Sequence, residues 1–154
     1  MNRIAIAAIA SGAGLLSACS SDSADPRIVG KWNCRGVNTA ERIEYNSAIH
    51  FKSNGTYEAN STIEGQQLGQ KARIQMIEKG KWSVDGSNFI NRPSGKPKIT
   101  SVTVGSDPLP EDTYAQIADQ YYAEQDASNG VSQIVTLTET DMTLDDGMKL
   151  FCER

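Results

Sequence analysis

The sequence is poor in the residue types on which most catalytic and metal sites depend. Its 154 residues include one histidine, His50, and only three cysteines. No CxxC pair occurs from which a tetrahedral metal site would be built. The chain also lacks the GxSxG, HExxH and P-loop motifs of common enzyme classes. We therefore expect a protein that is not an enzyme and that holds neither a metal nor a cofactor.

Positive charge is also scarce. There are 15 Lys and Arg residues against 19 Asp and Glu, which gives a net charge of −4. Binding to phosphates requires a concentrated surface of Lys and Arg, so nucleic acid is excluded as a partner. The length and a charged fraction of 22% indicate one small folded domain.

No apolar stretch near the N-terminus is long enough to cross a membrane. Residues 4–16 carry no charge, but a spanning helix needs about 20 apolar residues. This stretch follows Arg3 and precedes the small residues of Leu16-Ser17-Ala18-Cys19. A positive start, an apolar segment and a small-residue cleavage site together predict an export signal.

Leu16-Ser17-Ala18-Cys19 resembles the lipobox of bacterial lipoproteins. In that family the chain is cut before the cysteine, which is then acylated. The resemblance implies a signal peptide over residues 1–18, lipidation of Cys19 and attachment to a membrane through N-terminal acyl chains. Ser20 stands where aspartate is associated with retention in the inner membrane. The implied location is therefore the cell envelope, on the outer membrane and facing the periplasm.

The lipobox also divides the rest of the chain. Residues 19–26 are small and polar after Cys19, so we expect a lipidated cysteine and a flexible tether followed by one domain over residues 27–154. With Cys19 acylated, only Cys34 and Cys152 remain to pair. Export to an oxidising compartment then predicts a disulfide between these two cysteines.

Residues 43–51 alternate between apolar and polar side chains, which predicts a half-buried strand. We interpret Ser53-Asn54-Gly55 as a three-residue hairpin loop that places Phe51 opposite Tyr57. A two-residue turn would place Phe51 opposite Glu58 and expose a whole apolar face. The preferred register instead pairs His50 with Glu58 on the solvent side, which argues against a catalytic role for His50.

The middle of the chain continues this alternation. Between residues 72 and 84 the apolar face carries one acid, Glu78, and a turn of two or four residues then leaves Phe89 on the side of Trp82. Residues 98–104 are predicted to form another strand, with Val102 and Val104 on one face and Ile99 on the other.

Two further strands are predicted near the C-terminus. Val135 and Leu137 alternate with threonines, and the loop that follows places Met142 opposite Leu137. A loop over Asp145-Asp146-Gly147 would set Leu144 opposite Met148. By the same count Cys152 points inward.

One segment has helical rather than strand spacing. Apolar residues recur at i, i+3, i+4 and i+7 after the acidic Glu111-Asp112, and Asn129-Gly130 follows. We predict a helix over residues 110–125. It is either a packed cover on one end of the sheet or a lid or docking face, whose contact residues would be Tyr114, Ile117, Tyr121 and Tyr122.

The elements together predict a mainly β protein. About eight short antiparallel strands in consecutive hairpins favour an up-and-down β-barrel, which has no sheet edges, over a sandwich. One short helix is inserted before the last strands. The residues expected in the barrel interior, or in contact with a ligand, are Trp32, Tyr45, Phe51, Tyr57, Met76, Trp82 and Phe89.

Short motifs give the fold a second resemblance. Gly30-Lys31-Trp32, Asn54-Gly55-Thr56-Tyr57, a second Gly-Lys-Trp at residues 80–82 and the closing segment 135–154 resemble small bacterial lipocalin-like (calycin) domains. There the tryptophan of the first motif packs beside an arginine of the last strands. The resemblance implies Arg154 in that place over Trp32, with Arg35 as competitor.

Two function hypotheses follow. The first is a non-enzymatic, monomeric barrel that binds a small apolar or amphipathic, lipid-like ligand, because an eight-stranded barrel is wide enough for one small molecule. The second is a filled barrel that binds an envelope protein, as an inhibitor or an assembly factor. Exposed Tyr121 or Tyr122 would favour the second.

Overall fold

The computed structural model describes residues 24–67, 69–127 and 130–154. Within these ranges the chain forms ten strands and two helical segments. In chain order they are β1 (Gly30–Asn38), β2 (Ile43–Phe51), β3 (Thr56–Gln67), β4 (Gln70–Asp85), β5 (Asn88–Pro93), β6 (Lys98–Val104), β7 (Asp107–Pro108), the 3-10 helix η1 (Glu111–Thr113), α1 (Tyr114–Ala127), β8 (Val131–Leu137), β9 (Asp141–Asp145) and β10 (Lys149–Glu153).

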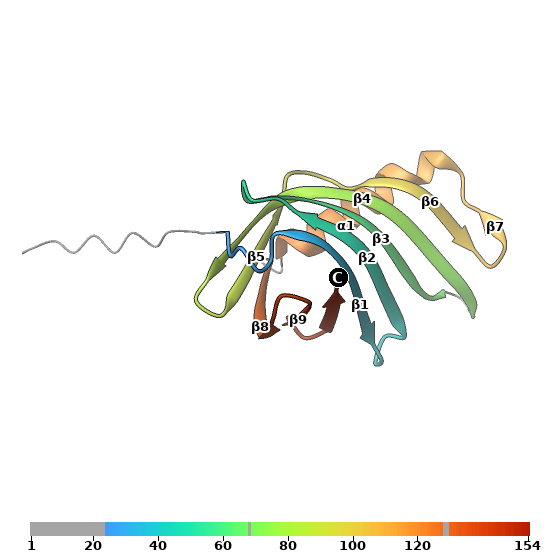
Figure 1. Ribbon diagram of the computed structural model, residues 1–154. Helices are drawn as coiled ribbons and strands as arrows, with labels where there is room; N and C mark the ends of the chain where they lie inside the picture. Colours follow the sequence, from blue (N-terminus) through green and yellow to red (C-terminus); the bar gives the residue numbers. More distant parts are fainter. Residues whose placement is uncertain (1–23, 68, 128–129) are drawn as a thin grey trace, which may run out of the picture.

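Eight of the strands close into an antiparallel barrel (Figure 1). Strands β1 to β4 each pair with the strand that follows them in the chain. Strand β5 then pairs with β8, β8 with β9, and β9 with β10. The pairing of β10 with β1 then completes the ring. This is the predicted up-and-down barrel, with the segment β6-β7-η1-α1 inserted between its fifth and sixth strands.

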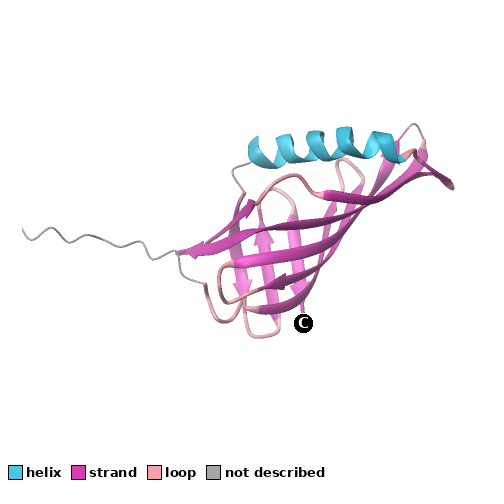
Figure 2. Ribbon diagram, turned by 90° about the horizontal axis from the view of Figure 1, so that it is seen from above, coloured by secondary structure: helices cyan, strands magenta, loops and turns pink. Residues whose placement is uncertain are grey.

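The inserted segment is joined to the barrel by strand pairing with one half of β4. The first half of β4 pairs with β6, and the second half pairs with β5. Helix α1 packs on β6, and Figure 2 shows it running beside the strands. The predicted helix is confirmed, with its first turn in the 3-10 form over η1.

The buried side chains form two clusters. The larger cluster lies inside the barrel, and its members Ile28, Trp32 and Trp82 fill the end where β1 begins and β10 ends. We call this the closed end. The smaller cluster, with Met76, Ile99 and others, lies between α1 and the strands that α1 covers. Residues Tyr114, Ile117, Ala118 and Tyr121 of α1 pack in it, so the helix is a packed cover.

The register of the β2–β3 hairpin agrees with the prediction. Phe51 pairs with Tyr57 and His50 with Glu58, while Gly55 has a φ of +76°. This left-handed conformation is one that glycine adopts without steric cost. In the β4–β5 hairpin Asp85 pairs with Asn88, so its loop has two residues.

Two bulges change which residues face inward, so two of the predicted strand faces are wrong. The pairing of β4 with β6 shifts between Gln75 and Met76, and Ile99 therefore joins Val102 in the cluster under α1 instead of facing away from it. The pairing of β8 with β9 shifts after Ile134, so Val135 is 54% exposed and does not share the inner face of Leu137. An extra residue in one strand reverses the alternation beyond it.

The last hairpin also differs from the predicted register. Leu144 pairs with Leu150, and Met142 pairs with Cys152. The loop therefore covers residues 146–148, one position later than predicted. Because the partners change by two positions, the inner face is preserved and Cys152 still points inward.

Candidate functional site

The closed end of the barrel is fastened by Arg154 and Trp32. The guanidinium carbon of Arg154 lies 4.1 Å from the centre of the Trp32 ring, and the Trp32 indole donates a 2.7 Å hydrogen bond to the Ile28 carbonyl. Arg154 also donates to the carbonyls of Arg27 and Val29. The predicted contact is therefore made by Arg154, whereas the competing Arg35 is exposed.

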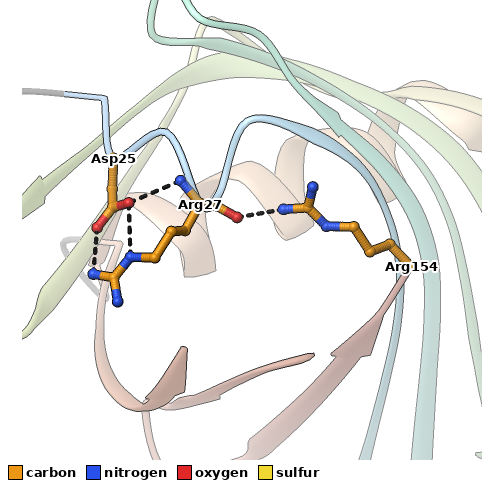
Figure 3. A network of polar contacts seen from close by, with 3 residues as sticks. All are labelled: Asp25, Arg27 and Arg154. Atoms are coloured by element: carbon orange, nitrogen blue, oxygen red, sulfur yellow. Dashed lines mark hydrogen bonds and ion pairs between the residues drawn. The ribbon is translucent and has the colours of Figure 1, made fainter. Parts of the chain in front are cut away.

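The segment before β1 is held at the same end. Asp25 accepts hydrogen bonds from the guanidinium and backbone of Arg27, and Figure 3 shows this pair beside the contact of Arg154 with the Arg27 carbonyl. The Arg27 guanidinium lowers the pKa of the Asp25 carboxyl. The described chain thus begins at the closed end.

A disulfide closes the seam of the barrel. Cys34 of β1 and Cys152 of β10 are direct partners in the strand register and are bonded to each other. Both residues are at least 95% buried. The predicted pairing is confirmed.

The barrel encloses a cavity of about 220 Å³. Its wall is mainly apolar, and it reaches the exposed Asp146 in the loop between β9 and β10. We call this side the open end. Strand β1 runs to it from the closed end, and β10 runs from it back to the closed end. The residues that line the cavity are Cys34, Ile43, Tyr45, Ile49, Phe51, Tyr57, Ala59, Ile63, Glu78, Phe89, Asn91, Tyr121, Gly130, Ser132, Met142, Leu144, Asp146, Met148 and Leu150.

A polar group projects into this cavity from three neighbouring strands. The Tyr57 hydroxyl of β3 donates to the Glu78 carboxylate of β4 at 2.5 Å, and it lies 3.2 Å from the Asn91 amide oxygen of β5. Glu78 is only 8% exposed. The short Tyr57 contact is typical of a hydroxyl that donates to a charged oxygen.

Burial dominates the acid–base properties of this group. It raises the pKa of the Glu78 carboxyl above its ordinary value, although the hydrogen bond from Tyr57 opposes the shift. Burial and the neighbouring Glu78 also raise the pKa of the Tyr57 hydroxyl. No Lys, Arg or His is found among the described residues that line the cavity, so this wall offers the buried carboxylate no cation.

A second polar group lies on the neighbouring strands β2 and β3. The Ser61 hydroxyl is 2.8 Å from that of Ser47 and 3.0 Å from that of Tyr45. Burial raises the pKa of the Tyr45 hydroxyl. These three hydroxyls satisfy one another, and of the three residues only Tyr45 lines the cavity.

Glycine at position 80 makes room for Tyr57. A Cβ atom on Gly80 would lie 2.5 Å from the Tyr57 ring and equally close to the Arg92 carbonyl oxygen. The missing side chain therefore lets the Tyr57 ring lie across β4 and reach Glu78. The glycine of the first Gly-Lys-Trp motif is needed for another reason. Gly30 has a φ of +133°, which side chains rarely allow, and it lies beside Arg154.

The structure separates the predicted interior residues into three groups. Tyr45, Phe51, Tyr57 and Phe89 line the cavity. Trp32 and Trp82 fill the closed end without reaching the cavity wall. Met76 packs under α1.

The predicted residues of the helix divide as well. Tyr114, Ile117 and Tyr121 pack against the cluster under α1, and Tyr121 also contributes to the cavity wall. Tyr122 is partly exposed and belongs to neither group. The predicted signal peptide, residues 1–18, and the lipidation site Cys19 lie outside the described residues.

Sequence reasoning recognised Glu78 as an inward acid but missed Asn91. The signal was present, because Asn91 follows Phe89 by two positions and strand alternation places both on one face. Ala59 follows Tyr57 by two positions on β3 and lines the cavity on the same face.

Known proteins give no further guide to this site. Comparisons with known protein families and with curated proteins find no match for the chain. In the described part of the chain no helix is long and apolar enough to cross a membrane. No cluster of three or more His, Cys, Asp or Glu side chains suited to a metal ion occurs in that part.

Proposed function

We propose that the protein is a lipid-anchored periplasmic protein of the outer membrane whose barrel binds a small apolar or amphipathic molecule without transforming it. The observation that carries this proposal is the cavity of about 220 Å³, walled by apolar side chains and reached from the open end. An apolar cavity of about 150 Å³ accepts benzene, whereas drug-sized pockets begin near 300 Å³. The ligand is therefore a molecule with one ring or a short acyl chain.

The position of the tether supports exchange of this ligand with the aqueous phase. The described chain begins at the closed end, where Asp25 and Arg27 are bonded. If Cys19 is lipidated, the tether joins the barrel at the end opposite Asp146. The open end is then free to point away from the membrane.

Native mass spectrometry tests ligand binding directly. The mature chain from Ser20 would be exported without lipidation and purified without detergent. We expect an additional small-molecule mass that is lost on denaturation, or binding of added one-ring compounds. If the chain carries no such mass and binds none of these compounds, the binding function is wrong.

A variant that fills the cavity supplies the specific control. Ala59 lies at the wall and is 2% exposed, so leucine at this position would occupy the space of the ligand. Ala48 is an exposed alanine on β2 and provides the matched substitution outside the barrel. We expect Ala59→Leu to reduce binding at least tenfold and Ala48→Leu to leave it unchanged.

A second candidate function is binding of an envelope protein. Four large apolar side chains on β1, β8 and β10 are at least 44% exposed, namely Val37, Val131, Val135 and Phe151. Exposed apolar side chains that lie together often mark interaction sites, and Phe151 pairs with Arg35, two positions before Val37 on the same face of β1. Cross-linking in intact cells would test this function, because Phe151→Ser should remove a cross-linked partner that Ala59→Leu retains.

A further inference from the structure

The cavity contains a buried carboxylate whose charge no basic side chain of the described wall compensates. Glu78 is 8% exposed, and its described side-chain partner is the Tyr57 hydroxyl. Burying a carboxylate costs free energy unless a cation or several hydrogen bonds compensate it. The cavity wall supplies one hydroxyl and no basic side chain among the described residues.

The surroundings of Glu78 are suited to a cation. Phe51, Tyr57 and Phe89 bring three aromatic rings to the same cavity. The Phe51 ring centre lies 6.2 Å from that of Tyr57 and 5.5 Å from that of Phe89. Aromatic faces attract ammonium groups, and the attraction is stronger where water is excluded.

The other charged residue of the described wall has the same sign. Asp146 lies at the open end and is exposed. An approaching cation therefore meets an acid at the entrance and a second acid inside, while an anion is repelled by both. The remaining titratable groups at the wall are the hydroxyls of Tyr45, Tyr57 and Tyr121.

We infer that the ligand is a small organic amine with an apolar body, and that its ammonium group binds at Glu78, Tyr57 and Asn91. This inference rests on the proposed binding function and narrows it to one chemical class. The ammonium donates to the Glu78 carboxylate and to the Asn91 amide oxygen, which both lie within hydrogen-bond distance of the Tyr57 hydroxyl. The apolar body then lies toward the side chains of Leu144 and Leu150.

Three probes of nearly equal size test the charge of the ligand. They are phenethylamine, 2-phenylethanol and phenylacetate, which carry a cation, a neutral hydroxyl and an anion on the same phenyl skeleton. Their dissociation constants would be measured by calorimetry at neutral pH on the mature chain from Ser20. We expect the amine to bind at least tenfold more tightly than the alcohol, because hydrogen bonds to a charged group are stronger than those between neutral groups. The anion should bind most weakly.

Two matched variants test whether Glu78 is the residue that binds the ammonium group. Glu78→Gln keeps the size of the side chain and removes its charge, so the preference for amine over alcohol should fall to less than threefold. Glu58 is the neighbour of Tyr57 on β3 and faces outward, with its carboxylate 3.2 Å from Lys79. Glu58→Gln removes the same charge outside the barrel and should keep the wild-type preference.

The outcomes separate this inference from the binding function. If the alcohol binds as tightly as the amine, or the anion binds best, the amine assignment is wrong while the binding barrel stands. The assignment is equally wrong if Glu78→Gln retains the tenfold preference. If none of the three probes binds, the amine assignment fails, and native mass spectrometry decides the binding function separately. If Glu78→Gln does not fold, the ranking of the three probes on the wild-type chain still decides.

Discussion

Arg154, the last residue of the sequence, covers the ring of Trp32 on the first strand at a distance of 4.1 Å. The same guanidinium bonds to carbonyl groups of the segment before β1. One side chain therefore connects the two ends of the folded chain at the closed end of the barrel. Together with the disulfide between β1 and β10, it fastens the seam that closes the sheet.

Replacement of Arg154 should weaken this closure. A cation–π contact contributes about 0.5 to 2 kcal/mol, so we expect Arg154→Ala to lower the free energy of unfolding by about 1 to 2 kcal/mol. Chemical denaturation of the mature chain would measure the change. Arg35→Ala removes an exposed arginine from β1 and should change stability by less than about 0.5 kcal/mol. Equal effects of the two variants would contradict a special role for Arg154.

The disulfide should contribute more than any single contact. It joins residues separated by 118 positions, and a loop of this length corresponds to about 4 to 5 kcal/mol in the chain-entropy model. We expect a Cys34→Ala/Cys152→Ala double variant to lose stability of this order in urea. Addition of a reductant should destabilise the wild type but leave the double variant unchanged. A response of the double variant to reductant would contradict this assignment.

The barrel could be predicted because its strongest signals are local. Alternation over residues 43–51 and a glycine in the following loop determine both the faces and the register of the first hairpin. The inward direction of Cys34 and Cys152 follows from the same period of two. These features depend on neighbours in the sequence, which is why reasoning from the sequence reaches them.

The remaining differences arise from tertiary packing. The two bulges insert Thr100 in β6 and Val135 in β8, and the alternation of apolar residues does not specify either position. They turn Ile99 toward α1 and expose Val135. The cavity also could not be predicted, because the identity of the inner residues does not determine whether their side chains fill the barrel.

Gly80 should be intolerant of even the smallest side chain. A Cβ atom there would lie 2.5 Å from both the Arg92 carbonyl oxygen and the Tyr57 ring. We expect Gly80→Ala to lower the unfolding free energy by about 1 to 3 kcal/mol and to disturb the contact of Tyr57 with Glu78. Thermal unfolding and amide chemical shifts of β3 would report the two effects.

Gly36 provides the control for this substitution. A Cβ atom at Gly36 would meet the flexible ends of Met148 and Leu150 at 3.2 to 3.3 Å. These side chains can move aside, so Gly36→Ala should cost less than Gly80→Ala. The opposite order would show that space for the Tyr57 ring is not what position 80 provides.

Membrane attachment is expected to depend on Cys19. Acylation contributes about 0.8 kcal/mol for each buried methylene, and more than one chain gives stable anchoring. We therefore predict that Cys19→Ala moves the protein from the membrane to the soluble fraction of disrupted cells. Ser17→Ala, which keeps a small residue before the cleavage site, should leave the protein attached. Sedimentation of Cys19→Ala with membranes would make the lipoprotein assignment wrong.

The buried carboxyl should give the protein a distinctive dependence of stability on pH. Burial raises the pKa of Glu78 above its ordinary value of 4.5. Between 4.5 and the raised value, the folded protein binds more protons than the unfolded chain. The contribution of Glu78 to the free energy of unfolding is therefore greatest below pH 4.5 and falls as the pH rises through the raised pKa.

Glu78→Gln isolates this contribution because glutamine does not titrate. The unfolding free energy of the variant minus that of the wild type should increase with pH above 4.5, by at most about 1.4 kcal/mol for each pH unit, and then become constant. Denaturation series in urea between pH 4 and pH 8 would measure it. Tyr57→Phe removes the hydrogen bond that opposes the pKa shift, so the fall in its stability should continue to a higher pH than in the wild type. Parallel profiles for wild type and Glu78→Gln would mean that this carboxyl meets enough compensating charge or water in the folded barrel to titrate as it does in the unfolded chain.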